Sequence, residues 1–293
     1  ILLYFSKKND AEKLARRAIQ MQPNSAKAYY NFGVIMKNLG KFKDAEISLC
    51  KAIQLKPDYA KVYYLLSKLK DSINNKLINE NLFSMHILNN QSKLDLIDIY
   101  FARANFLHKK RKFKESSKYL RLANNNKLSL KKSKSDSLIN KSKLLSMESN
   151  HNENHNKDEL KSYQSIFIVG MFRSGSTLVE SILSMNSLVK DLGEINILEK
   201  SFLHSKMNNQ ELTLPELYWK YTDIYNSGFM ISTNKWLYNY QYAGIISCQI
   251  PNAKIIHCLR HPLDNILSIY RANFANGSEY ASSLVDCAKV YLN

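Results

Sequence analysis

The sequence is poor in the residues that build disulfide-linked or metal-bound folds. It has four cysteines in 293 residues, and none of them forms a CxxC pair or another metal-ligand spacing. We therefore expect structural thiols in a reducing compartment, with disulfides or a metal site as the alternative. No apolar run approaches the roughly 20 residues that a membrane-spanning helix needs. These absences favour a cytoplasmic protein without a membrane span, although the sequence begins at Ile1 and shows no targeting signal to judge.

Negative charge is also scarce. Lys and Arg number 42 against 25 Asp and Glu, a formal net charge of +17. The excess is mostly Lys mixed with Asn, Ser and Ile along the whole chain, which is typical of compositional drift and not of one basic patch. It favours a polyanionic small ligand or an acidic substrate over nucleic acid. The 45% of hydrophobic residues suffices for two domains with cores of their own.

The first part of the sequence repeats itself at a shift of 34 residues. EKLARRAIQMQPNSAKAYY, from Glu12, aligns with EISLCKAIQLKPDYAKVYY, from Glu46. Small residues recur where helices would cross, Pro closes the second helix, and Gly40 marks the turn between two helices. The pattern resembles the tetratricopeptide repeat. This resemblance implies stacked helix pairs with a concave surface over residues 1–123.

A more degenerate unit begins at Ile99, where Phe113 takes the place of Phe42, and residues 67–95 are expected to be helical but off-pattern. The recurring Tyr and Phe residues either pack between repeats or form a peptide-binding surface. Residues 124–165 are poor in large apolar side chains and rich in Asn, Ser and Lys. They predict a polar linker with a short helix at Leu138–Met147.

A strand, a tight loop and a helix are predicted at the start of the second domain, residues 166–293. In IFIVGMFRSGSTLVESIL, from Ile166, an apolar run reaches Gly170, breaks into a polar loop and resumes at helical spacing. Gly170 and Gly175 have the spacing of the GxxxxGK[ST] phosphate-binding loop, which places an anion at a helix N-terminus. Ser176 stands where that motif has Lys, and no strand ending in Asp follows. Ordinary ATP or GTP hydrolysis is therefore disfavoured.

Arg173 supplies the cation that the missing Lys does not. An Arg before Ser174, Gly175, Ser176 and Thr177 resembles the 5′-phosphosulfate loop of sulfotransferases, which use 3′-phosphoadenosine 5′-phosphosulfate as donor. The resemblance implies that Arg173 and the backbone amides from Ser174 to Leu178 hold the 5′-phosphate and sulfonate oxygens.

A second motif lies in PNAKIIHCLRHPLDNILSIYRANF. The β-leaning run Ala253–Leu259 predicts a strand that ends at Arg260, and a helix is predicted to start near Asp264. Arg260 and Ser268, eight residues later, are spaced to meet on one doubly charged group, with a surface ion pair for Arg260 as the alternative. This Arg-x7-Ser arrangement after a strand resembles the 3′-phosphate site of sulfotransferases.

With the repeats in front, the whole chain resembles the bacterial tetratricopeptide-repeat sulfotransferases, whose catalytic half is similar to protein-tyrosine sulfotransferases. The resemblance implies an α-solenoid followed by a P-loop-like α/β domain with a central parallel sheet. It also implies that the chain continues past Asn293 with a piece that closes over the adenosine. Because a sulfuryl group carries less charge than a phosphoryl group, we expect no metal requirement.

The resemblance also points to catalytic residues. Glu194 lies in a Gly-Glu pair like the one that supplies the base in tyrosine sulfotransferases, and Asp191 and Glu199 are weaker candidates. A helix-capping or surface role for Glu194 is the alternative. Lys235 lies in the Asn-Lys pair whose Lys contacts the leaving oxygen in the same relatives, and its alternative is an ordinary surface lysine.

Two departures qualify the match. The relatives commonly have Pro where this chain has Phe172, so we expect a less rigid loop. His261 stands where they often carry Asp, and His257, on the predicted strand, is expected to be packed; neither is assigned a role.

The sequence thus predicts sulfuryl transfer to a hydroxyl of a peptide, glycan or small molecule. The repeats favour a peptide or protein ligand, a protein tyrosine among them. The alternatives are a non-catalytic tetratricopeptide scaffold with a degenerate nucleotide-binding domain, and a P-loop kinase, which Ser176 disfavours.

Overall fold

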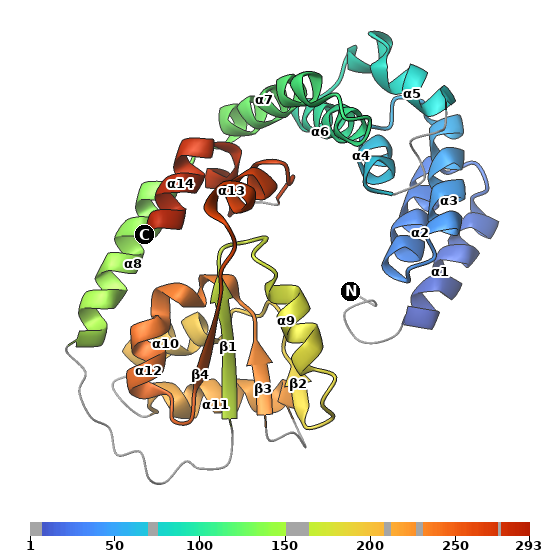
Figure 1. The fold of residues 1–293 in the computed structure, drawn as a ribbon. Coiled ribbons are helices and arrows are strands. Elements are labelled where there is room, and N and C mark those ends of the chain that lie inside the picture. Colours follow the sequence, from blue (N-terminus) through green and yellow to red (C-terminus); the bar gives the residue numbers. More distant parts are fainter. Residues whose placement is uncertain (1–7, 70–75, 151–163, 208–211, 227–230, 275–276) are drawn as a thin grey trace. The chain divides into compact units, whose positions relative to one another are not determined.

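The chain divides into two units, each with its own core. The structure, a computed structural model, describes residues 8–69, 76–150, 164–207, 212–226, 231–274 and 277–293. The first unit comprises residues 1–133 and 273–282, and the second comprises residues 134–272 and 283–293. Figure 1 labels their helices and strands. Among the described residues, every helix falls short of the length and apolar character that crossing a bilayer requires.

The first unit is helical, as the repeats predict. Its elements are α1 (Lys8–Met21), α2 (Ala26–Asn38), α3 (Phe42–Leu55), α4 (Ala60–Lys68), α5 (Lys76–Phe83), η2 (His86–Leu88), α6 (Lys93–Lys109), α7 (Phe113–Leu130) and η4 (Glu279–Ser282). Ser25 caps α2, because its side chain accepts a hydrogen bond from Ala28 N at 3.3 Å. Gly40, at φ 76°, makes the left-handed turn between α2 and α3.

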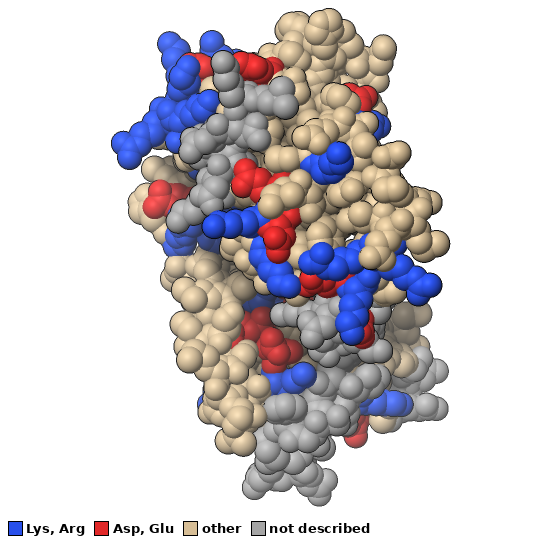
Figure 2. Space-filling model, turned by 90° about the vertical axis from the view of Figure 1, so that its right-hand side faces the viewer, with Lys and Arg blue, Asp and Glu red and all other residues tan. Residues whose placement is uncertain are grey.

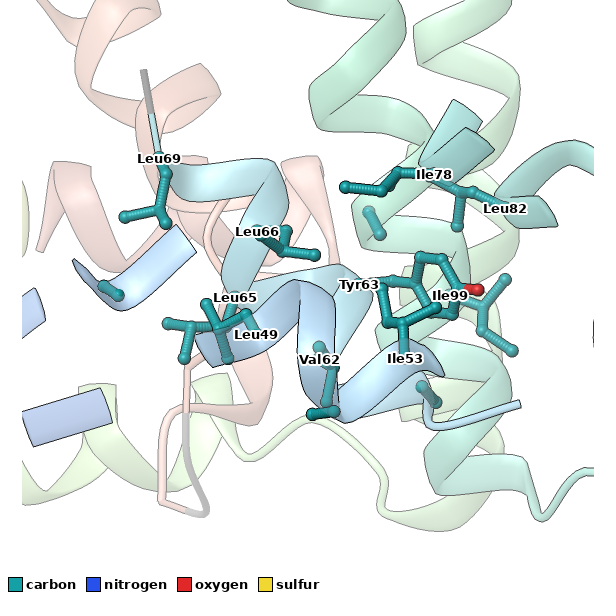
Figure 3. Close-up of a cluster of buried hydrophobic side chains, with 14 of the residues drawn as sticks. Leu49, Ile53, Val62, Tyr63, Leu65, Leu66, Leu69, Ile78, Leu82 and Ile99 are labelled. Carbon is teal, nitrogen blue, oxygen red and sulfur yellow. The ribbon is translucent and has the colours of Figure 1, made fainter. Parts of the chain in front are cut away.

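Small residues stand where these helices cross. A Cβ on Gly33 of α2 would lie 2.8 Å from the Leu49 side chain of α3, so the close crossing requires glycine. Figure 3 shows the core around this crossing, where Leu49, Ile53 and Tyr63 pack with residues of the neighbouring helices. A small residue of the repeat pattern therefore corresponds to a close contact between α2 and α3.

The aromatic residues of the repeats differ in burial. Tyr63 is fully buried, and Tyr64 packs against Phe101 with 6.1 Å between ring centroids. Phe42 and Phe113 begin α3 and α7 and are both exposed. Packing between helices therefore describes these tyrosines, whereas Phe42 and Phe113 are largely exposed, although the Phe113 ring contacts His108 of α6 with 5.0 Å between centroids.

Residues 273–282 complete the first unit although they come late in the chain. Lys127 Nζ donates to Asn273 Oδ1 at 3.1 Å and to Phe274 O at 2.8 Å. Asp98 Oδ1 accepts a hydrogen bond from Asn273 Nδ2 at 3.0 Å. Glu279 of η4 forms an ion pair with Lys131. These bonds tie the late segment to α6 and α7.

The second unit is an α/β domain with a four-stranded parallel sheet of order β2-β3-β1-β4. Its elements are α8 (Ser135–Asn150), β1 (Gln164–Gly170), α9 (Ser176–Leu183), β2 (Val189–Asp191), α10 (Ile197–Met207), α11 (Leu214–Asn226), β3 (Ile231–Asn234), η3 (Leu237–Tyr242), α12 (Ala243–Gln249), β4 (Lys254–Cys258), α13 (Pro262–Tyr270) and α14 (Leu284–Leu292). The central parallel sheet expected from the sequence is confirmed.

Strand β1 is the centre of this domain. Its Phe167 and Val169 are buried with Leu198, Tyr218 and Ile246, which come from α10, α11 and α12. The helices that carry these residues lie beside the sheet in Figure 1. β1 lies between β3 and β4, and apolar side chains pack against it. These contacts fix the position of its carboxyl end, so the loop that follows β1 starts from a fixed point.

The segment expected to be a polar linker differs from the expectation. Its first residues continue α7 to Leu130, and α8 covers the helix expected at Leu138–Met147, while residues 151–163 lie outside the described ranges. The second unit already begins with α8. Leu145 joins the core, and Gly244 of α12 leaves room for Ser149, whose Oγ would lie 2.5 Å from a Cβ there. Leu145 and Ser149 thus pack this otherwise polar helix against the domain, and ion pairs of Lys141 and Glu148 with α10 also hold it.

The positive charge is spread over the chain. On the face shown in Figure 2, Lys and Arg side chains lie among Asp and Glu and large uncharged areas. This distribution agrees with the even spacing of Lys along the sequence.

Candidate functional site

The carboxyl ends of all four strands meet at one edge of the parallel sheet. The loop 171–175 follows β1, Gly193 and Glu194 follow β2, Lys235 follows β3, and Arg260 follows β4. After β1 the chain forms β2 and β3 on one side of β1 and then β4 on the other side, and such a switch of direction opens a crevice at the strand ends. The sequence-predicted residues therefore come from separate segments to one place.

The loop after β1 has an uncommon backbone. Arg173 has φ 68° and Gly175 has φ 103°, so two nearby residues adopt left-handed conformations before α9 begins at Ser176. Gly170 has φ 137°, and a Cβ there would lie 2.5 Å from Cys258 O of the adjoining strand β4. Glycine is required at this position because β1 and β4 approach closely where the loop leaves the sheet.

Side chains from the second motif hold this loop. Asn265 Nδ2 donates to Phe172 O at 3.0 Å, and Arg260 Nη1 donates to Arg173 O at 3.2 Å. The Phe172 ring packs edge-on against Tyr238 with 5.4 Å between centroids. The residue that replaces the relatives' Pro is therefore anchored through its carbonyl and its ring.

The two phosphate-binding motifs predicted from the sequence are in direct contact. Arg173 Nε donates to Ser268 Oγ at 3.3 Å across 95 positions of sequence. The backbone of Arg260 is held by Tyr291, whose Oη donates a hydrogen bond to Arg260 O at 2.8 Å. Among the residues that the structure describes, no carboxylate forms an ion pair with Arg260, so the surface ion pair considered above does not form there.

The start of α9 offers groups suited to an anion. The side-chain oxygen of Ser174 is buried and has no hydrogen-bond partner among the described residues. Ser176, which stands at the Lys position of the phosphate-binding loop, is 4% exposed as the first residue of α9. The helix dipole adds partial positive charge at this end. A small buried hydroxyl, and not a long cation, is what the backbone accommodates at position 176.

Lys235 and Glu194 form the second half of the site. Lys235 Nζ lies 2.9 Å from Glu194 Oε1 and 3.4 Å from Thr177 Oγ1 of the loop helix. The Lys235 side chain is 7% exposed and that of Glu194 53%. The turn that carries Lys235 is shaped by Asn234, whose Oδ1 accepts from Trp236 N and Asn239 Nδ2, both at 3.0 Å. A buried ammonium thus touches both the helix that follows the β1 loop and an accessible carboxylate.

Comparison with known proteins identifies both parts of the chain. A family model described as a sulfotransferase domain matches residues 163–288, and one described as a tetratricopeptide repeat matches residues 14–47. The chain contains a tetratricopeptide repeat and a sulfotransferase domain.

One curated relative also matches. The chain is 33% identical over 130 residues to a protein of Aquifex aeolicus (strain VF5) that bears the name "Uncharacterized protein". The match covers 38% of this chain but 17% of that protein, so this chain spans less than a fifth of the relative's length. No solved structure matches the chain.

Sequence reasoning missed Glu180 of the sulfotransferase domain. This residue of α9 is 6% exposed, and its carboxylate lies 3.7 Å from Lys235 Nζ. Burial raises the pKa of Glu180, while Lys235 and hydrogen bonds from Thr233 and Gly193 oppose the rise. The available signal was a charged residue within the apolar helix pattern from Leu178 to Leu183.

The two weaker base candidates differ in their surroundings. Asp191 is exposed at the end of β2. Glu199 forms an ion pair with Lys141 of α8 and accepts from Asn196 Nδ2 at 2.7 Å. Burial alone would raise the pKa of Glu199, but these bonds lower it overall. Glu199 thus joins α8 to α10.

The expectation that His257 is packed is wrong. β4 is an outer strand of the described sheet, and His257 is exposed on it. His261 precedes α13 and is also exposed. Within the described part of the chain, no cluster of three or more His, Cys, Asp or Glu residues has a geometry for holding a metal ion.

Proposed function

We propose that the sulfotransferase domain transfers a sulfuryl group from 3′-phosphoadenosine 5′-phosphosulfate to a hydroxyl group of an acceptor. The observation that carries this proposal is the 3.3 Å hydrogen bond between Arg173 of the loop and Ser268 of α13. It supports the proposal because Arg173 contacts Ser268 and accepts a bond from Arg260 at its carbonyl, next to a helix N-terminus, as a ligand with phosphate groups at two positions would need.

The residues present fit such a donor. Arg173 and the amides from Ser174 to Leu178 would hold the 5′-phosphate and sulfonate oxygens, and the buried Ser174 hydroxyl lacks another partner among the described residues. Arg260 and Ser268 would hold the 3′-phosphate. The donor supplies an activated sulfuryl group, and the protein supplies position and charge.

The Lys235–Glu194 pair provides the groups that the transfer needs. Glu194 would accept the proton of the attacking hydroxyl at its carboxylate, which solvent and an acceptor reach because the side chain is half exposed. Lys235 Nζ, held beside Thr177 of the loop, would stabilise negative charge on the leaving oxygen. The new bond joins the acceptor oxygen to sulfur, and the bond between sulfur and the phosphate oxygen breaks.

The two alternatives explain less. A kinase would need a cation at position 176, where the structure buries a serine against the sheet edge. A non-catalytic scaffold would not need an accessible carboxylate 2.9 Å from a buried ammonium at the mouth of the site.

We include a peptide or protein acceptor in the proposal. The tetratricopeptide repeat is an architecture for binding peptides, and Phe42 and Phe113 present exposed rings on it. A panel of tyrosine peptides, serine peptides, sugars and simple phenols, incubated with labelled donor, tests this part. Exclusive labelling of sugars would contradict it.

Calorimetric titration of the full-length protein tests the donor. We expect 3′-phosphoadenosine 5′-phosphate to bind more tightly than adenosine 5′-phosphate, and ATP with Mg²⁺ to bind more weakly. Arg260→Ala should weaken 3′-phosphoadenosine 5′-phosphate by about 2 kcal/mol, or about 30-fold, because a charge-assisted contact is lost. It should barely affect adenosine 5′-phosphate, which lacks the 3′ group.

Lys254→Ala is the matched control, because Lys254 is an exposed cation at the opposite end of the same strand β4. Its binding of both nucleotides should equal that of the wild type. Equal losses for both nucleotides in Arg260→Ala would contradict the 3′-phosphate assignment, and a preference for ATP with Mg²⁺ would favour the kinase.

A further inference from the structure

Helix α9 turns a polar face inward. Ser176 and Glu180, one turn apart, are its buried residues, whereas Leu178 and Ile182 are 66% and 57% exposed. Of the apolar side chains at helical spacing, Leu178 and Ile182 therefore lie outside the buried face, whereas Val179 and Leu183 are half-buried beside Ser176 and Glu180. A helix that buries a carboxylate and exposes leucine does so against the usual preference of these groups.

The Glu180 carboxylate joins three segments of the site. Its Oε1 accepts hydrogen bonds from Gly193 N at 3.2 Å and from Thr233 Oγ1 at 3.1 Å. Its Oε2 lies 3.7 Å from Lys235 Nζ. The loop helix, the turn that carries Glu194 and the end of β3 are thus linked through one side chain.

Burial makes this arrangement costly without its partners. A carboxylate in the interior loses hydration worth several kcal/mol, which an ion pair and hydrogen bonds must offset. The Lys235 side chain is buried to a similar degree as that of Glu180, at 7% and 8% exposure. The Lys235 ammonium therefore offsets part of the cost of burying the Glu180 carboxylate, and Glu180 and Glu194 together offset the cost of burying Lys235.

We propose that Glu180 is a positioning residue of the sulfotransferase reaction, which holds Lys235 Nζ against the loop and fixes the Gly193 turn that carries Glu194. The inference rests on the proposed function, because it assigns Glu180 an effect through Lys235. Glu180 itself touches neither the donor nor the acceptor: its two oxygens are directed to Gly193, Thr233 and Lys235.

The test is the substitution Glu180→Gln in the full-length protein. Gln keeps an oxygen for Gly193 and Thr233, but it removes the charge that faces Lys235. We expect kcat for sulfuryl transfer to the best acceptor of the panel, or to water without acceptor, to fall about 100-fold, the scale of a misplaced catalytic group. The donor KM and the affinity for 3′-phosphoadenosine 5′-phosphate should stay within about threefold.

Two comparisons separate positioning from plain stability. Glu148→Gln removes the carboxylate of another Glu–Lys pair of this domain, Glu148–Lys206, and should leave kcat unchanged. In a Lys235→Met background, Glu180→Gln should cause no further loss of kcat, because the group through which it acts is gone. A full additional loss in that background would overturn the proposal, as would an unchanged kcat in the single variant.

If Glu180→Gln does not fold, Thr233→Val tests the positioning role of Glu180 instead. It removes one donor to Glu180 Oε1 with little change of shape, and we expect a smaller fall in kcat that also vanishes in the Lys235→Met background. An unchanged kcat in Thr233→Val would then reject the inference. A wild-type protein that binds no 3′-phosphoadenosine 5′-phosphate and transfers no sulfuryl group would instead overturn the proposed function, and the role of Glu180 with it.

Discussion

The two units of the chain bury polar side chains in different ways. In the first unit, several buried groups bond to backbone carbonyls. Arg103 donates to Leu82 O at 2.8 Å and to Ser84 O at 2.9 Å, and Ser116 Oγ donates to Ala104 O at 2.8 Å. The carbonyls at the end of α5 have no partner within their own helix. Arg103 therefore serves the packing of α5 and α6.

In the sulfotransferase domain, the buried groups near the strand ends bond to each other and to the loops there. Glu180 pairs with Lys235, and Asn265 holds Phe172 O. The difference predicts whether a substitution of a buried polar group changes stability or activity. A buried polar group that completes a helix end supports stability, whereas one that faces the strand ends supports the site.

Glu194→Gln should have the largest effect and should confine it to activity. Loss of a general base typically lowers the rate by about 10²–10⁴-fold. The half-exposed side chain contributes little to packing, so the unfolding midpoint in urea should barely change. Steady-state rates and urea titrations check this prediction. A fall in rate with Asp191→Asn, and none with Glu194→Gln, would move the base to the end of β2.

Arg103→Met tests the opposite half of the contrast. Met fills a similar length but leaves the carbonyls of Leu82 and Ser84 without donors and removes the guanidinium between the Phe83 and Tyr119 rings. The free energy of unfolding should fall by about 4 kcal/mol. The rate of sulfuryl transfer per folded molecule should stay at the wild-type value.

Arg121→Met is the control, because Arg121 is exposed on α7 of the same unit. Its unfolding free energy should change by about 0.5 kcal/mol or less. A loss of activity in folded Arg103→Met protein would erase the distinction between the two units.

Asp98→Asn should have the smallest effect, visible only as a change with pH. Burial raises the pKa of Asp98 to about 6, although Lys61, Lys68 and the bond from Asn273 oppose it. The folded protein therefore holds this proton at pH values where the unfolded chain, with a pKa near 3.8, has lost it. The wild type should lose stability as pH rises between these two values.

The Asn variant lacks this titration. Its stability relative to the wild type should rise by about 2 kcal/mol between pH 4 and pH 7, since one pKa unit corresponds to about 1.4 kcal/mol and some solvent reaches the group. Urea unfolding at both pH values measures it. A stability difference that does not change with pH would contradict the assignment.

The repeat and the loop were readable from the sequence because both are local patterns. Gly33 and Gly40 report a crossing and a turn within one helix pair, and the loop from Gly170 to Ser176 is contiguous. The proximity of Arg173 and Ser268 could be expected because each follows a predicted strand, and parallel strands have their carboxyl ends at the same edge of a sheet. The assigned chemical roles of these residues stay predictions.

The pairing of Glu180 and the left-handed turn at Arg111 could not be predicted in the same way. The fate of Glu180 depends on Lys235 and Thr233, more than fifty positions away, and no local spacing encodes that pairing. Arg111, at φ 58°, occupies the position that corresponds to Gly40, so a left-handed turn occurs without its usual residue. Tertiary packing overrides local preference in both cases.

The late segment Asn273–Ser282 has a consequence for biosynthesis. Asp98, Lys127 and Lys131 find their partners in this segment, so the first unit is complete only after residue 282 has left the ribosome. While most of the sulfotransferase domain is translated, the helices made first therefore lack the contacts of Asp98, Lys127 and Lys131 with this segment. The first unit is therefore made first but completed late, and a protein cut between the two units would lack the segment that completes the helical unit.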